Sequence, residues 1–146
     1  MFVVTIKDFK IIPYVRMTRK GKFVKKRALQ YVQNQNQLAW LIKVHGKGSI
    51  ESFPVILKGI VVLKNLRKNA DLDNYLKAVQ DALVKAGILP DDCLKYIGKV
   101  EFIVKQGKKD VLTCFLKEMK TSQVFNHYDH DHQNMCMPSP HCKCEE

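Results

Sequence analysis

The sequence lacks any apolar stretch that could cross a membrane. A membrane-spanning helix needs about 20 apolar residues, and no run in this chain of 146 residues approaches that length. The N-terminal run MFVVTIKDFK is also too short for a signal peptide, because Lys7 and Asp8 interrupt it. These absences predict a cytoplasmic protein without a membrane partner.

Disulfides and repeats are also not expected. Cytoplasmic thiols stay reduced, so the five cysteines are more consistent with buried, metal-binding or idle side chains than with disulfide bonds. Cys93 and Cys114 carry no signal beyond ordinary packing. No internal repeat is visible. Since 46% of the residues are hydrophobic, the chain has enough apolar surface for one domain with a modest core.

Acidic residues are scarce relative to basic ones. The chain holds 25 Lys and Arg against 14 Asp and Glu, a net charge of +11. Residues 1–120 contain 24 of the bases and 10 of the acids, whereas residues 121–146 contain one base and four acids. A strongly basic domain attracts polyanions, and nucleic acid is the leading candidate because each neutralised phosphate releases a counterion. The alternative is a well-solvated, soluble surface.

The spacing of apolar residues predicts an α+β domain in which two helices pack on a mixed sheet. The second helix is the most clearly patterned, because its apolar residues recur at spacings of three and four and Gly87 follows its last turn. The predicted order is β-α-β-α-β-β: strand 2–9, helix 28–44, strand 55–64, helix 72–86, and strands 94–105 and 110–119.

Two basic segments stand out as candidate phosphate contacts. Residues 13–27 predict a basic loop or short hairpin arm, and QGKK, between the last two predicted strands, predicts a basic hairpin tip. Phe23, at the centre of the arm, is a candidate wedge for unstacking DNA, with a packing anchor as the alternative. The candidate nucleic-acid-binding residues are Arg16, Arg19, Lys20, Lys22, Lys25, Lys26, Lys68, Lys108 and Lys109.

Asp71 and Asp73 come directly before and within the start of the second predicted helix. In an extended backbone their side chains point the same way, and two carboxylates about 5 Å apart repel by about 3 kcal/mol at an effective dielectric of 20. A divalent cation reverses this repulsion, and Mg²⁺ favours carboxylates together with water and phosphate oxygens. The alternative is that the acids cap the helix and pair with Lys77 in a non-catalytic nucleic-acid-binding protein.

A longer pattern runs from Asp71 to Asp92: D-L-D-N-x-x-K-x-x-x-D-A-L-x-x-A-G-x-x-x-D-D. It resembles the signature of the RusA family of Holliday-junction resolvases, which are common in phages and prophages. PYVRMTRKGKF and YVQNQNQLAWLI resemble the family's basic arm and first helix more loosely. The resemblance covers about residues 1–120. Ala70 departs from it, because many relatives have a basic residue or proline before the first Asp; Arg67 and Lys68 are the candidate substitutes.

The resemblance implies a Mg²⁺-dependent endonuclease, with Mn²⁺ as a substitute, that resolves branched DNA in recombination and repair as an intimate homodimer. A nuclease that prefers flaps or forks is the alternative. Carried over by position, the implied metal ligands are Asp71, Asp73 and Asp92, and Lys77 is the implied essential lysine. Asp81 and Asp91 match family positions with less certain roles.

A length argument bears on how Asp92 meets the other acids. The helix from Asp73 to Ala86 rises about 20 Å, and the residues that follow span at most about 20 Å when fully extended. Gly87 and Pro90 lie on this route and usually turn the chain. A return within one chain therefore looks strained, so we expect a site shared between two subunits related by a two-fold axis.

Residues 121–146 differ in composition and are expected to form an appendage separate from the domain of residues 1–120. They hold seven of the ten His and Cys residues of the chain within eighteen positions. Imidazole and thiolate are suitable zinc ligands, so Zn²⁺ binding is one hypothesis, and a disordered tail with incidental chelation is the other. The candidate ligands are His127, His130, His132, Cys136, His141, Cys142 and Cys144.

Overall fold

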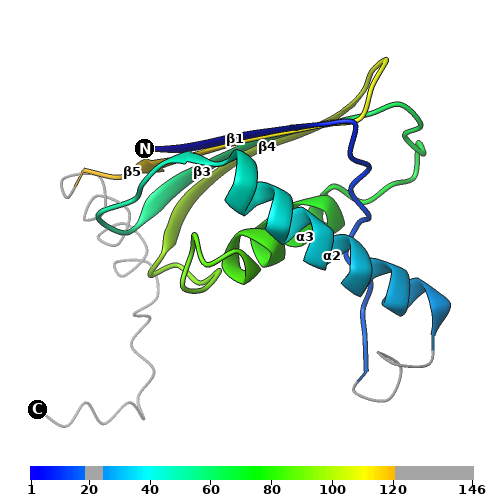
Figure 1. Ribbon diagram of the computed structural model, residues 1–146, viewed down its shortest axis with the longest axis horizontal. Helices are drawn as coiled ribbons and strands as arrows, with labels where there is room; N and C mark the ends of the chain where they lie inside the picture. The colour runs from blue at the N-terminus through cyan, green and yellow to red at the C-terminus, as the bar shows by residue number, and fades with distance from the viewer. Residues whose placement is uncertain (19–24, 121–146) are drawn as a thin grey trace, which may run out of the picture.

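The computed structural model describes residues 1–18 and 25–120 of the chain, which form a five-stranded mixed sheet with both helices on one face (Figure 1). The strand order is β2-β1-β5-β3-β4, and only the β3–β4 pair is parallel. The predicted α+β class is confirmed. The strands are β1 (Phe2–Lys7), β2 (Lys47–Gly48), β3 (Val55–Leu63), β4 (Ile97–Gln106) and β5 (Val111–Glu118).

The sheet is apolar on its helix-facing side because alternate residues of each long strand point the same way. In the central strand β3, Val55, Leu57, Val61 and Leu63 are all buried. Gly59 continues this row and leaves room for the ring of Phe102, which would lie 2.6 Å from a Cβ atom at that position. The helix-facing side of β3 is therefore part of the core.

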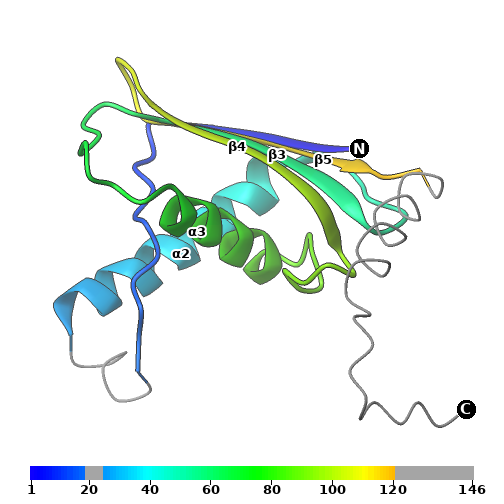
Figure 2. The same cartoon turned by 180° about the vertical axis from the view of Figure 1, so that it is seen from behind.

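The helices are α2 (Lys26–His45) and α3 (Leu72–Lys85), and they lie against each other beneath the sheet (Figure 2). In α2 the buried positions recur at spacings of three and four, as an amphipathic helix requires. The run QNQNQ continues this helix because one of its members, Gln35, falls on the buried stripe and donates from Nε2 to the Ala78 carbonyl at 2.9 Å.

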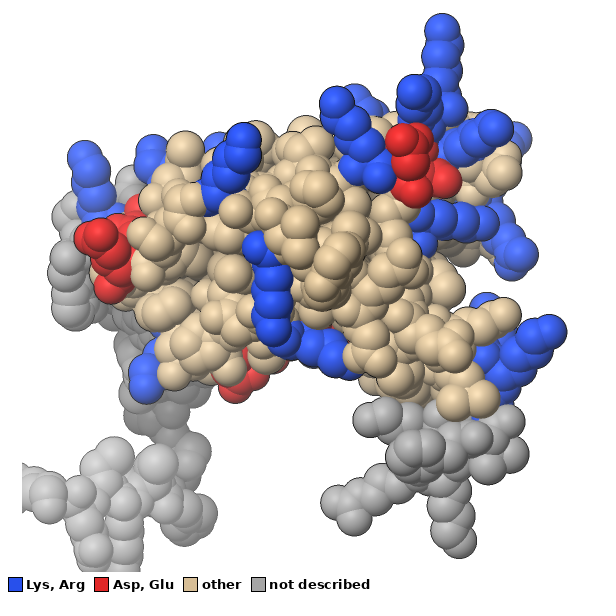
Figure 3. Space-filling model, viewed as in Figure 1, with Lys and Arg blue, Asp and Glu red and all other residues tan. Residues whose placement is uncertain are grey.

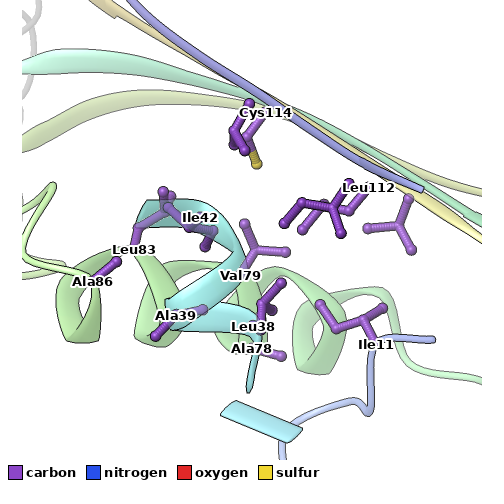
Figure 4. Close-up of a cluster of buried hydrophobic side chains, with 14 of the residues drawn as sticks. Ile11, Leu38, Ala39, Ile42, Ala78, Val79, Leu83, Ala86, Leu112 and Cys114 are labelled. Atoms are coloured by element: carbon purple, nitrogen blue, oxygen red, sulfur yellow. The ribbon is translucent and has the colours of Figure 1, made fainter. Parts of the chain in front are cut away.

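The core forms where the two helices meet the sheet (Figure 4). Leu38 and Ile42 of α2 and Val79 and Leu83 of α3 are each completely buried. Cys114 of β5 is buried among the same cluster, and burial raises the pKa of its thiol to about 12. This packing fixes α3, and with it the acidic segment, against α2.

One prediction about the sheet is wrong, because β4 and β5 do not form a hairpin. β3 lies between them, so residues 107–110 cross the end of β3, and the Gly107 N–H donates to the Leu63 carbonyl at 3.0 Å. The reason is that a helical crossover places the next strand parallel to the first. α3 thus brings β4 alongside β3, and β5 pairs on the other side.

The other differences are small. The short strand β2 lies between the predicted helix 28–44 and the predicted strand 55–64, where no strand was predicted. β1 ends two residues before the predicted end because Asp8 adopts a left-handed conformation with φ of 57°. Neither of the two described helices has the length and apolarity of a membrane span. Residues 121–146 lie outside the described residues, so the expected appendage and its Zn²⁺ ligands stay predictions.

Candidate functional site

Asp71 and Asp73 lie at the N-terminus of α3, and both are exposed. Asp71 is the N-cap residue, and its Oδ1 accepts the backbone N–H of Asp73 at 3.2 Å. The prediction that one of these acids caps the helix is therefore confirmed. The cap also holds the Asp71 carboxylate close to the first turn, where the positive end of the helix dipole favours negative charge.

Lys77, one turn further along α3, lies between two carboxylates. Its Nζ is 2.9 Å from Oδ1 of Asp81, and it also donates a hydrogen bond to Oδ2 of Asp92. Partial burial opposes the charged amine, but the hydrogen bonds to Asp92 and Asp81 outweigh it and raise the pKa of Lys77 above its usual value. The same bond from Lys77 lowers the pKa of Asp92. Lys77 and Asp92 are therefore both charged near neutral pH.

The chain turns back after α3, so that Asp92 contacts Lys77 one turn into the helix, and the expected sharing of the site between subunits stays a prediction. After α3 the chain does not extend: Gly87 has a φ of 76°, and the N–H groups of Ile88 and Leu89 both point to the Leu83 carbonyl, at 3.1 and 3.4 Å. Leu89 is buried, so this turn is anchored in the core. The turn brings Asp92 back along α3 within a single chain.

Two residues outside the acidic motif complete the hydrogen-bonded group. Tyr31 of α2 is 3% exposed, and its hydroxyl donates to Oδ2 of Asp81 at 3.0 Å. The ring of Tyr14 meets the Tyr31 ring edge-on at 5.7 Å, and the Tyr14 N–H donates to the Asn74 carbonyl at 2.9 Å. In the sequence Tyr31 is only one position of the predicted helix 28–44, because nothing local shows that its hydroxyl meets a carboxylate.

The basic arm is described only in part. Arg16, Lys25 and Lys26 line a surface hollow of about 480 Å³, and Lys26 begins helix α2 instead of ending the arm. The remaining predicted arm residues, Arg19, Lys20, Lys22 and Phe23, lie outside the described residues.

A second basic group lies at the end of the sheet where β4 leads into β5 (Figure 3). The loop after β3, residues 64–70, meets the loop between β4 and β5, residues 107–110. The Lys64 N–H donates to Oδ1 of Asp110 at 2.8 Å, and Gln106 Nε2 lies 3.4 Å from the Lys64 carbonyl. The first of these loops runs directly into Asp71. We call this group the sheet-end cluster; its members are Lys64, Arg67, Lys68, Lys108 and Lys109.

The carboxylates suit a hard cation by their chemistry but are not gathered into one three-ligand site. Within residues 1–18 and 25–120, no group of three or more His, Cys, Asp or Glu side chains is placed to hold a metal ion. Asp71 and Asp73 offer carboxylate oxygens at the helix start, and Mg²⁺ commonly takes one or two carboxylates plus water and phosphate. Asp92 is instead engaged by Lys77.

Comparison with known proteins decides between an enzyme and a binding protein. The sequence matches the family described as endodeoxyribonuclease RusA over residues 13–109, about two thirds of the chain. The chain belongs to the RusA family. No curated protein sequence matches it. Membership of the RusA family makes this chain an endodeoxyribonuclease, so the alternative of a non-catalytic nucleic-acid-binding protein is set aside. The matched range includes the acids, Lys77 and all nine predicted nucleic-acid-binding residues.

Proposed function

We propose that this RusA-family endodeoxyribonuclease resolves Holliday junctions by hydrolysing phosphodiester bonds in branched DNA, with Mg²⁺ or Mn²⁺ and as a homodimer. The observation that carries the proposal is the family match, which spans the acidic motif and the basic arm together. The exposed acids at the start of α3, close to basic loops, support it, because the bases attract the DNA backbone and the acids attract a cation.

Asp71 and Asp73 are the proposed primary metal ligands, and Asp92 is the proposed third. A bound Mg²⁺ ion would polarise the scissile phosphate and lower the pKa of a water molecule for attack. Lys77 keeps Asp92 next to α3 and brings a positive charge to the face where charge develops on the phosphate. The Asp71 cap holds one carboxylate still while this happens.

Two basic surfaces converge on the start of α3. The loop that carries Lys64, Arg67 and Lys68 of the sheet-end cluster leads directly into Asp71. The arm contacts the first turn of α3 through the hydrogen bond from the Tyr14 N–H to the Asn74 carbonyl. We propose that both surfaces bind phosphates of the junction, one on each side of the acids. Such contacts position DNA without reading its sequence.

The decisive experiment incubates the full chain with four-way junctions, with and without Mg²⁺. We expect cleavage only with the metal, and we expect Asp73→Asn to bind the junction without cutting it. Glu101→Gln, an exposed acid of β4, is the control for an equal change in charge and should cut normally. No cleavage by the wild-type chain, or cleavage by Asp73→Asn, would refute the proposal. A parallel panel of flaps and forks tests the alternative substrates.

The tail carries a separate proposal. We propose that residues 1–120 suffice for cleavage and that the His and Cys residues of 121–146 bind Zn²⁺. Zinc content measured on the purified full chain and on a 1–120 truncation tests this. Equal zinc in the two proteins would contradict the second part, and loss of cleavage on truncation would contradict the first.

A further inference from the structure

A chain of hydrogen bonds connects the buried interface between the helices to the proposed active site. The Tyr31 hydroxyl donates to one oxygen of Asp81, and the other Asp81 oxygen binds Lys77. Lys77 in turn donates to Asp92. The three links run from a side chain that is 3% exposed to two side chains, Lys77 and Asp92, that are 40% and 30% exposed.

The two partners of Lys77 are not equivalent. Asp92 lies on the turn that follows α3 and is a proposed metal ligand, so metal binding would compete with Lys77 for its carboxylate. Asp81 lies on α3 itself, and its second oxygen is occupied by a hydroxyl from the core. A lysine side chain has four rotatable bonds and is poorly ordered without a fixed partner. Asp81 is the partner that can hold it.

We infer that Tyr31 is a positioning residue, which through Asp81 keeps the Lys77 amine at the site of cleavage. This inference rests on the proposed function, because it presumes that Lys77 acts on the scissile phosphate. The Tyr31 ring is also the surface on which Tyr14 packs. The base of the DNA-binding arm and the lysine therefore share one buried support in α2.

The same interface offers a matched control. Gln35, one turn further along α2, also donates to α3, but its acceptor is the backbone carbonyl of Ala78. Its Oε1 is buried and has no hydrogen-bond partner within the described part of the chain. Gln35 thus contributes a buried polar contact between α2 and α3 that does not lead on to Lys77.

The first test compares Tyr31→Phe with Gln35→Met in single-turnover cleavage at saturating Mg²⁺. Loss of one hydrogen bond to a charged group corresponds to roughly a ten-fold change. We therefore expect Tyr31→Phe to cleave about ten-fold more slowly, with junction affinity unchanged within about two-fold, and Gln35→Met to cleave at the wild-type rate. Equal rates for Tyr31→Phe and wild type, or equal losses in both variants, would overturn the inference.

The second test asks whether the effect passes through Asp81. If it does, adding Tyr31→Phe to Asp81→Ala should cause no further loss of cleavage rate, whereas independent effects would multiply. A third measurement needs no cleavage: a double-mutant cycle of Tyr31→Phe and Lys77→Met in urea unfolding should show coupling. Additive effects on the free energy of unfolding would contradict the proposed link from Tyr31 through Asp81 to Lys77. If wild-type protein cuts no junction but the coupling is present, the proposed function fails, whereas the positioning of Lys77 by Tyr31 through Asp81 is still supported.

Discussion

Asp71 has a structural role and a proposed chemical role. Its carboxylate caps α3, and it is also a proposed metal ligand. Capping needs a side-chain oxygen acceptor, which Asn also provides, whereas Mg²⁺ favours a charged carboxylate. A single position therefore allows the two roles to be separated.

We predict that Asp71→Asn abolishes Mg²⁺-dependent cleavage and leaves the free energy of unfolding nearly unchanged. Asp71→Ala should abolish cleavage and also lower the free energy of unfolding by about 1 kcal/mol, because the cap is lost. Urea unfolding and junction cleavage on both variants provide the measurement. Full cleavage by Asp71→Asn would show that Asp71 only caps the helix.

Tyr31 makes the free energy of unfolding depend on pH in the alkaline range. Burial raises the pKa of Tyr31 above its usual value of 10.0, and the neighbouring Asp81 carboxylate raises it further. Above pH 10 the unfolded chain loses this proton while the folded chain retains it. The contribution of Tyr31 to stability is therefore complete below pH 10 and is lost as the pH rises.

We predict that between pH 10 and 12 the free energy of unfolding of the wild type falls more steeply than that of Tyr31→Phe. The difference in slope is at most about 1.4 kcal/mol per pH unit, the value for one proton. Urea unfolding at several pH values gives both curves. Tyr75, whose pKa burial also raises, is present in both proteins and so does not affect the comparison. Parallel curves would contradict the prediction.

At the scale of elements, the turn that ends α3 decides where Asp92 lies. Ala86 is the C-cap and Gly87 follows in the left-handed region, so the predicted helix stop is confirmed. The buried Leu89 then holds the turn against the core. A helix end thus does more than stop a helix, because it returns a candidate ligand to the face of α3 that carries Lys77.

We predict that Gly87→Ala lowers the free energy of unfolding by about 1 to 2 kcal/mol and slows cleavage. No atom lies within 4 Å of a Cβ at this position, so the effect comes from the left-handed backbone and not from a clash. Gly87→Asn should lose less, since Asn tolerates this conformation better. Urea unfolding tests whether the free energy of unfolding decreases from wild type to Gly87→Asn to Gly87→Ala. Equal stability of all three proteins would show that the left-handed backbone at residue 87 causes no strain.

At the scale of the whole molecule, the basic residues form separate groups on the surface. Bases are present in the sheet-end cluster and in the described part of the arm, and the outer side of the sheet has its own lysines, two of which pair with Glu101. Only the first two groups are proposed to meet DNA.

We predict that Lys108→Ala with Lys109→Ala weakens junction binding and reduces its dependence on salt. On duplex DNA each lost phosphate contact lowers the log–log slope by about 0.9. Lys58→Ala with Lys99→Ala removes the same charge from the pair around Glu101 and should leave the slope unchanged. Binding titrations at several salt concentrations give the slopes. Equal slopes for both double variants would place the DNA elsewhere.

A mixing experiment tests how the site is divided between subunits of the proposed dimer. If Asp92 acts in the site of its own chain, where it contacts Lys77, each chain carries a complete site. Heterodimers of an Asp73→Asn subunit and an Asp92→Asn subunit then carry a defect in each site and should not cut. Recovered nicking in the mixture, with neither homodimer active, would instead show that the acids come from different subunits.

The sequence alone determined the α+β class, the span of α3 and the RusA resemblance, because each depends on local periodicity, capping chemistry or residue spacing. It did not place β3 between β4 and β5, or foresee the short strand β2, since strand order depends on pairings between distant segments. Of the site, the acids and Lys77 could be identified from spacing along one helix.

The partners of Lys77 were decided by tertiary structure. Tyr31 lies 50 residues from Asp81 in the sequence, and Asp92 reaches Lys77 only because Leu89 is buried beneath the turn. Local patterns set which residues can cap, pair or bind a cation. Packing of α2, α3 and the sheet then selects which of those contacts form, because burial and distance exist only in the folded chain.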